Sequence, residues 1–239
     1  MIAILLLSSA LSLSLQEEPL RQAERLFAGR DNVAQLRQAI SLLEDLLARN
    51  PSSPYEVLWR LAKYRYYLSL RQEDASGRLR WLEAGIEAAK KAVALDGERP
   101  EGHFWLGATY GDYAELKGAF KSLRLVRTIR REFEAAWRIA PAYENGNVYL
   151  ALGEMDLRLP RLLGGNQERG MQRLEKGLEV GPTNAELKLA LAGYYLRSGR
   201  KEEARRWLES ILRVADPART PREQKELRNK AHRLLEKAR

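Results

Sequence analysis

Cysteine is absent from the 239 residues of the chain. Its absence excludes a disulfide framework, a cysteine-ligated metal site, a thiol nucleophile and a lipid-modified N-terminal cysteine. Histidine is scarce, because only His103 and His232 occur and neither belongs to an HExxH motif. The sequence also lacks a Gly-x-Ser-x-Gly nucleophile elbow. We therefore expect no metal, no cofactor and no catalytic residues, and we predict that the protein is not an enzyme.

Residues typical of β-strands are also sparse. Phe, Val and Ile are few, whereas Leu, Ala, Glu and Arg dominate the composition, which favours helix over sheet. The formal net charge of +9 could favour an anionic partner such as nucleic acid or a lipid surface. Because both signs of charge are abundant, a plain excess of arginine on a mixed surface is the favoured interpretation.

The chain begins with an apolar run. Met1–Leu15 is apolar apart from serines, and it is too short to span a bilayer, which takes about 20 helical residues. The run resembles the apolar core of a secretory signal peptide, with a small-x-small cleavage signal at Ser8–Ala10 or Ser12–Ser14, although no Lys or Arg precedes it. We predict a signal peptide over residues 1–15 and a periplasmic or secreted mature protein. A nucleic-acid partner is then not expected.

One helical pattern recurs along the rest of the chain. In its clearest copy, Tyr195 lies on a helix that Gly199 can end in a left-handed conformation. Ala204 and Leu208 then share one face of a second helix. The position that Ala204 holds occurs five times, each followed twelve residues later by the end of a repeat: Ala39 and Pro51, Gly85 and Gly97, Ile129 and Pro141, Gly170 and Pro182, and Ala204 and Asp216. These starts are 46, 44, 41 and 34 residues apart.

A small residue before the turn, a glycine in it and an alanine early in the next helix resemble one unit of a tetratricopeptide (TPR) repeat, whose period is about 34 residues. The resemblance implies an all-α fold, a right-handed α-solenoid of about five divergent TPR-like hairpins over residues 16–239. The expected hairpins and the helix that caps the C-terminal end are 20–51, 54–97, 100–141, 146–182, 184–217 and 221–238.

The segment from Gly118 to Pro217 resembles a narrower group. Its motifs are Phe120-Lys121-Ser122-Leu123, Phe133-Glu134-Ala135-Ala136 and Leu159-Pro160-Arg161-Leu162-Leu163-Gly164-Gly165-Asn166. They are similar to those of bacterial extracytoplasmic TPR proteins that include the T component of TRAP transporters, and more distantly to regulator-of-microtubule-dynamics-like proteins. The resemblance implies a protein that acts through protein contacts and brings no catalytic residues. T components are often lipoproteins, whereas this chain lacks the cysteine.

Helix starts are marked by local motifs. Three capping boxes are predicted, at Ser53–Glu56, Thr183–Glu186 and Thr220–Glu223, and Asp31 is a further candidate N-cap. In the 159–166 segment, Pro160 should end a helix, Gly164-Gly165 allows a turn and Asn166 can cap the next helix. Since leucines in a turn need cover, we expect this loop to fold back onto the array.

The function expected from the resemblance is an extracytoplasmic scaffold for protein–protein interaction, with a transporter-associated subunit as one form. Its partner would be another envelope protein or a peptide; self-association and weak contact with a membrane surface stay open. In TPR arrays the first helices of the hairpins line a concave groove. With Gly107, Gly153 and Ala192 at the small position, the groove-facing residues are expected to be Phe104, Ala108, Leu150, Glu154, Leu189 and Leu196.

Two further features leave alternatives open. Arg124, Arg127 and Arg131 are three and four residues apart, so they form either a stripe that docks an anionic partner or a solvated face with local ion pairs. The aromatic stretch 55–67 either packs between hairpins or, with Leu162 and Leu163, lines a cavity. The cavity would make the protein a carrier of apolar small molecules or lipids, which is the alternative function.

Overall fold

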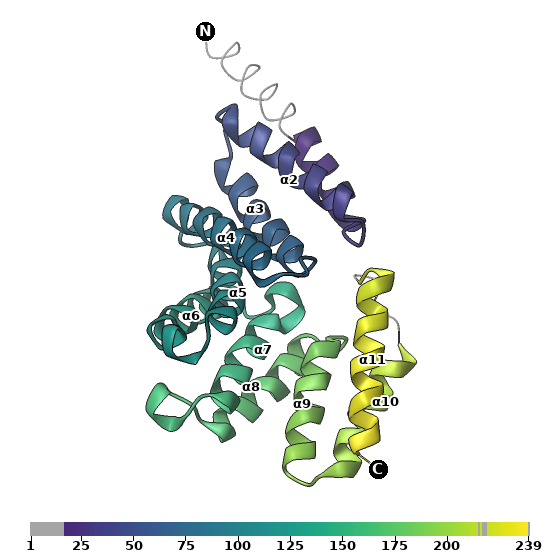
Figure 1. Ribbon diagram of the computed structural model, residues 1–239. Helices are drawn as coiled ribbons and strands as arrows, with labels where there is room; N and C mark the ends of the chain where they lie inside the picture. The colour runs from purple at the N-terminus through teal and green to yellow at the C-terminus, as the bar shows by residue number, and fades with distance from the viewer. Residues whose placement is uncertain (1–16, 215, 217–218, 239) are drawn as a thin grey trace. The chain divides into compact units, whose positions relative to one another are not determined.

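The computed structural model describes residues 17–214, 216 and 219–238, and the secondary structure of this part of the chain is helical throughout, with no strand (Figure 1). The predicted all-α fold class is confirmed. The predicted signal peptide over 1–15 and Pro217, the last residue of the fifth expected hairpin, lie outside the described residues. Within the described part, no helix is both long enough and apolar enough to cross a membrane.

The helices follow one another with short connections. A first helix over residues 17–28 precedes α2. The others are α2 (Val33–Ala48), α3 (Pro54–Ser69), α4 (Ala75–Leu95), α5 (Pro100–Lys117), α6 (Ala119–Ile139), α7 (Tyr143–Arg158), the short 3₁₀ turn η1 (Arg161–Leu163), α8 (Gln167–Val180), α9 (Ala185–Arg197), α10 (Lys201–Arg213) and α11 (Pro221–Lys237). Their contacts divide the chain into two compact units, one that ends at Ile129 and one that begins at Arg130 within α6.

In the first unit, α3 packs against α2, α4 and α5. Leu36, Leu61 and Leu82 are among its fully buried side chains. The aromatic residues join this packing, because the ring of Phe27 stacks on Tyr64 with centroids 4.2 Å apart, and Tyr66 lies 5.7 Å from Trp105. The aromatic stretch 55–67 therefore fills the space between successive hairpins, which is the packing interpretation of its rings.

In the second unit, α7 pairs with α8, α9 pairs with α10, and α11 packs on α10 and α9. Its core contains Leu174, Leu187, Leu191 and Leu208. The terminal helix α11 adds Leu227 and, one turn on, a buried alanine, while most of its charged side chains are exposed. A helix with one apolar face closes the end of a helical array, as the sequence predicted for residues 221–238.

The crossing of α7 and α8 depends on two glycines. A Cβ atom on Gly170 would lie 2.7 Å from Leu157 Cγ and 3.0 Å from the carbonyl oxygen of Gly153. A Cβ on Gly153 would lie 2.8 Å from Leu174 Cδ2 and 3.1 Å from the carbonyl oxygen of Gly170. Backbone oxygen cannot move aside as a flexible side chain can, so the two helices approach this closely only with glycine on both.

Three of the predicted helix ends are confirmed. Thr220 accepts from the N–H of Glu223, whose side chain accepts from the N–H of Thr220, which completes the capping box of α11. Asn166 accepts from the N–H of Arg169 and caps α8. Gly199 adopts φ 74°, the left-handed conformation expected between α9 and α10.

The other three predicted N-caps are wrong. Two of them lie one residue before the actual cap, and the side chain of the third makes no capping hydrogen bond. Asn32, the residue directly before the helix, caps α2 rather than Asp31, whose carboxylate pairs with Arg71. Asn184 rather than Thr183 caps α9. Ser53 precedes α3 but its side chain makes no capping hydrogen bond. In the first two cases an asparagine directly before the helix offers the amide oxygen to the first free N–H groups.

We expect Gly170→Ala to lower the free energy of unfolding by about 1–3 kcal/mol, because the added methyl group forces α7 and α8 apart. The matched control is Gly111→Ala in α5, where an added Cβ meets nothing within 4 Å. This control should be more stable than the wild type by up to about 1 kcal/mol, the helix propensity difference between alanine and glycine. Urea unfolding of the wild type and the two variants tests both expectations. Equal free energies of unfolding for the two variants would contradict the conclusion that the close crossing of α7 and α8 requires glycine at position 170.

Candidate functional site

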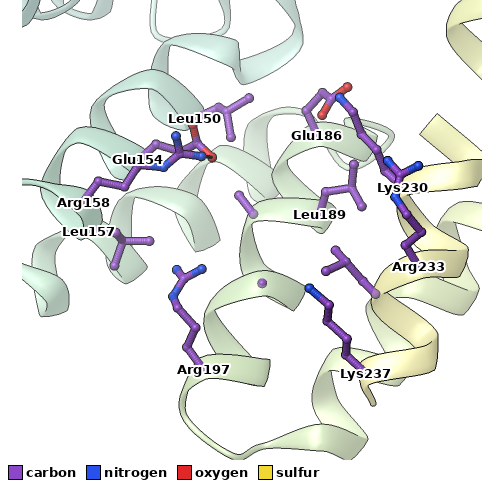
Figure 2. A pocket seen from close by; sticks show the side chains of 13 residues that line it. Leu150, Glu154, Leu157, Arg158, Glu186, Leu189, Arg197, Lys230, Arg233 and Lys237 are labelled. Carbon is purple, nitrogen blue, oxygen red and sulfur yellow. Dashed lines mark hydrogen bonds and ion pairs between the residues drawn. The ribbon is translucent and has the colours of Figure 1, made fainter. Parts of the chain in front are cut away.

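A groove of about 550 Å³ opens in the second unit between α7, α9 and α11 (Figure 2). One side of it carries Leu150 and Glu154 of α7, and the opposite side carries Lys230, Arg233 and Lys237 of α11. The helix α9 lies between them. We define the apolar lining residues of the three helices as the floor of the groove: Leu150, Leu157, Leu189, Ala190 and Leu234.

The charges of the groove do not balance. Its two carboxylates are already paired, Glu154 with Arg158 at 2.9 Å and Glu186 with Arg219 at 3.3 Å. Four cations of the lining have no ion-pair partner in the described part of the chain: Arg197, Lys230, Arg233 and Lys237. We define these four residues as the cationic rim. The groove thus combines an apolar floor with an excess of positive charge.

Gly193 sits in the middle of α9 and lines the groove. A Cβ atom at this position would meet only the Nη1 atom of Arg197, at an ordinary contact distance of 3.5 Å. Glycine inside a helix costs up to about 1 kcal/mol relative to alanine. In contrast to Gly170, packing does not require this glycine, and its effect is to leave space open above the floor.

The structure brings together three of the six residues expected in a groove. Leu150, Glu154 and Leu189 line it, whereas Leu196 packs against the core of the second unit. The other two lie on α5 in the first unit, where Phe104 is buried with its ring 5.1 Å from Trp105 and Ala108 is half-buried. That any of the six contacts a partner stays a prediction.

The sequence reasoning missed the cationic rim. Lys230, Arg233 and Lys237 are spaced at i, i+3 and i+7, which is a visible helical stripe. The sequence predicts their helix only as the cap at the C-terminal end of the solenoid, so its charged side chains are expected to face solvent. Gly193 carries no signal in the sequence, because nothing distinguishes a glycine that opens a groove from one that packs.

The three arginines of the predicted stripe, Arg124, Arg127 and Arg131, belong to α6 and do not line the groove. Arg124 and Arg127 are exposed in the first unit, and the side chains of residues 119–122 beside them are not described. Arg131, in the second unit, pairs with Glu132 at 2.7 Å. Arg131 thus makes a local ion pair, and the anionic docking role of all three arginines stays a prediction.

The two histidines make no metal site with their neighbours. His103 is placed to donate from Nε2 to the carbonyl oxygen of Gly97 at 3.0 Å, which ties α5 to the preceding turn. His232 is exposed on α11. Among the residues that the structure describes, no group of three or more His, Asp or Glu side chains is placed to hold a metal ion.

The α7 wall of the groove is anchored by a buried carboxylate on its far side. Asp156 is 1% exposed, and its oxygens accept from Arg130 at 2.8 Å, from Arg169 at 2.6 and 2.7 Å, and from Arg173 at 2.5 Å. Burial opposes the charged form of this carboxyl. The hydrogen bonds from Arg169 and Arg130 and the nearby charge of Arg173 outweigh that effect, so the pKa of Asp156 lies below its ordinary value.

The same arginines fix the 159–166 loop. Arg130 and Arg169 donate to the carbonyl oxygen of Gly164 at 3.2 and 2.7 Å. The N–H of Asn166 donates to the carbonyl oxygen of Asp156 at 2.8 Å. The expectation that the loop folds back over its leucines is wrong for Leu162, whose side chain is 98% exposed. Side-chain bonds to the backbone hold the loop, so it needs no apolar cover.

Asp156→Asn should lower the free energy of unfolding by about 3 kcal/mol at neutral pH, because three guanidinium groups lose their shared counter-charge. The folded pKa of Asp156 is depressed, so its contribution is complete above the unfolded value of about 3.9 and is lost as the pH falls through the folded value. Urea unfolding from neutral pH to about pH 2 should therefore show the gap between wild type and variant narrowing in acid.

The control for this change is Glu154→Gln, which removes a carboxylate whose pair with Arg158 is largely exposed. Its effect should stay below about 1 kcal/mol. An Asp156→Asn variant as stable as this control at neutral pH would contradict the anchoring role.

Comparisons with known proteins agree with this architecture. A family model described as regulator of microtubule dynamics protein 1-3 matches residues 19–153, more than half of the chain, and a tetratricopeptide repeat model matches residues 165–220. No curated protein matches the chain.

Among solved structures, the chain is similar to TTC0263, a thermophilic TPR protein of Thermus thermophilus, at 23% identity with a TM-score of 0.68, covering 92% of this chain and 98% of that one. It is also similar to MamA, at 18% identity with a TM-score of 0.49, covering 85% and 91%. The first of these likenesses shows the TPR fold, while the resemblance to TRAP-transporter T components is not confirmed. The chain has the TPR fold, matches a tetratricopeptide repeat over residues 165–220 and, by the match over residues 19–153, belongs to the regulator of microtubule dynamics protein 1-3 family.

Proposed function

We propose that the protein is an interaction scaffold whose second unit binds a segment of another protein in the groove between α7, α9 and α11. TPR domains generally mediate protein–protein interactions, and a protein partner is therefore the expected kind. The observation that carries the proposal is the groove itself. It has a leucine floor, a cationic rim without ion-pair partners among the described residues, and a glycine that packing does not require.

The alternative function, a carrier of apolar small molecules, is less well supported. Seven of the thirteen residues that line the groove are charged, and a purely apolar ligand would desolvate them without compensation. The aromatic stretch expected to form a cavity is engaged in packing, since Tyr55 and Tyr64 are 7% and 2% exposed. A protein segment offers both apolar and charged groups, and it therefore fits the lining better.

We also propose that the mature protein acts outside the cytoplasm, in the periplasm or secreted, with an envelope protein as its partner. The support is the apolar run Met1–Leu15, which resembles a signal peptide. A transporter-associated subunit is one form of this role. N-terminal sequencing of the protein from fractionated host cells should find a start near residue 16 in the extracytoplasmic fraction. An intact Met1 in the cytoplasmic fraction would contradict this location.

The groove can be filled without disturbing the core. Gly193→Leu places a side chain above the floor, and Gly111→Leu makes the same change in α5, where an added Cβ meets nothing within 4 Å. Both variants should unfold at the urea concentration of the wild type or above it, because leucine favours helix over glycine.

Affinity for a partner purified from the native host, measured by titration calorimetry, should then separate the two variants. Gly193→Leu should weaken binding about tenfold or more through steric overlap, while Gly111→Leu should bind like the wild type. Equal affinities of the two variants would show that the partner does not bind in the groove.

A further inference from the structure

The chemistry of the partner follows from the groove, and the following inference rests on the proposed function. We propose that the bound segment is acidic and amphipathic. Its carboxylates face the cationic rim, and its apolar side chains lie on the floor formed by the leucines of α7, α9 and α11.

The positive charge of the chain is concentrated in the stretch that forms α9, α10 and α11, two of which line the groove. Residues 185–239 contain 15 Lys and Arg against 8 Asp and Glu, a net +7 of the total +9. Within this stretch, Lys230, Arg233 and Lys237 follow one face of α11 at spacings of three and four residues. Like charges at these spacings repel one another and destabilise a helix. A carboxylate bound between them would relieve that repulsion.

Internal electrostatics account for only part of the rim. Arg197 and Lys237 lie in the last turns of α9 and α11, where a cation interacts favourably with the helix dipole. Lys230 and Arg233 lie earlier in α11 and have no ion-pair partner in the described residues. These two cations therefore define where an external carboxylate gains most.

The floor adds an apolar requirement. Leu150, Leu157 and Leu234 line the groove and are half-buried, so each keeps apolar surface in contact with water. Leu189 lines it too, at 9% exposure. Covering this surface removes apolar area from water, which is favourable in proportion to the area. A segment that carried only carboxylates would leave the floor uncovered, so leucine-like residues must alternate with the acidic ones.

Other anionic partners fit less well. The lining contains no aromatic residue on which a nucleic-acid base could stack. A bilayer surface is flat, whereas the floor of the groove lies between two helical walls. A flexible protein segment can enter such a groove and place both kinds of side chain.

The test uses the purified full chain and short fluorescent peptides measured by anisotropy. A peptide in which glutamate and leucine are interspersed should bind at least about tenfold more tightly than the same peptide with lysine for glutamate or serine for leucine. Its affinity should fall as salt is added, because the rim is exposed to solvent. A single-stranded DNA of similar length and vesicles of phosphatidylcholine with phosphatidylglycerol should bind more weakly than the acidic peptide.

Charge reversal locates the site. Lys230→Glu with Arg233→Glu should weaken binding of the acidic peptide about tenfold or more. The matched control, Arg206→Glu with Lys225→Glu, changes the net charge equally at exposed positions of the same unit that do not line the groove. This control should lose at most about threefold, through long-range attraction alone.

Three results would overturn the inference: equal binding of the glutamate and lysine peptides, equal losses in the two double variants, or tighter binding of DNA or vesicles than of the acidic peptide. The proposed function would still stand after any of these results if Gly193→Leu blocks binding of the natural partner and Gly111→Leu does not. Failure of that glycine comparison would remove both proposals.

Discussion

Asp156 places one carboxylate, 1% exposed, among the guanidinium groups of Arg130, Arg169 and Arg173. These arginines come from α6 and α8, so the carboxylate of α7 ties three helices together. Two of the arginines also hold the carbonyl oxygen of Gly164. A buried charge of this kind is stable only when its partners surround it. The position of α7, and with it one wall of the groove, depends on this contact.

Glycine has two opposite effects in the second unit. At Gly153 and Gly170 its missing side chain lets α7 and α8 approach to a distance that a Cβ would prevent. At Gly193 a Cβ would fit, and the missing side chain leaves open space instead. The first effect stabilises the unit, and the second sacrifices helix propensity for an open surface. Sites of function are where such local losses are expected.

The helical fold could be predicted because its signals are local. Helical spacing, Gly199 and the capping box at Thr220 depend on neighbours a few residues away, and the structure has them as expected. The Asp156 contacts could not be predicted, because Arg130 is 26 residues away and any of the chain's 41 Lys and Arg residues could have been its partner. The repeat pattern alone predicts that Leu150, Glu154 and Leu189 line a groove, whereas the cationic rim depends on α11 lying opposite α7, which no local pattern shows.

The central claim is that the groove of the second unit receives a protein segment. It is tested most directly by replacing Ala190, on the groove floor, with the photoreactive residue p-benzoylphenylalanine in the native host, beside the same replacement at the exposed Gln167 of α8. After irradiation, mass spectrometry of the products identifies the attached peptides. If the groove receives such a segment, position 190 should cross-link to one acidic, leucine-containing segment of a partner protein and position 167 should not. The same products from both positions, or none from position 190, would contradict it.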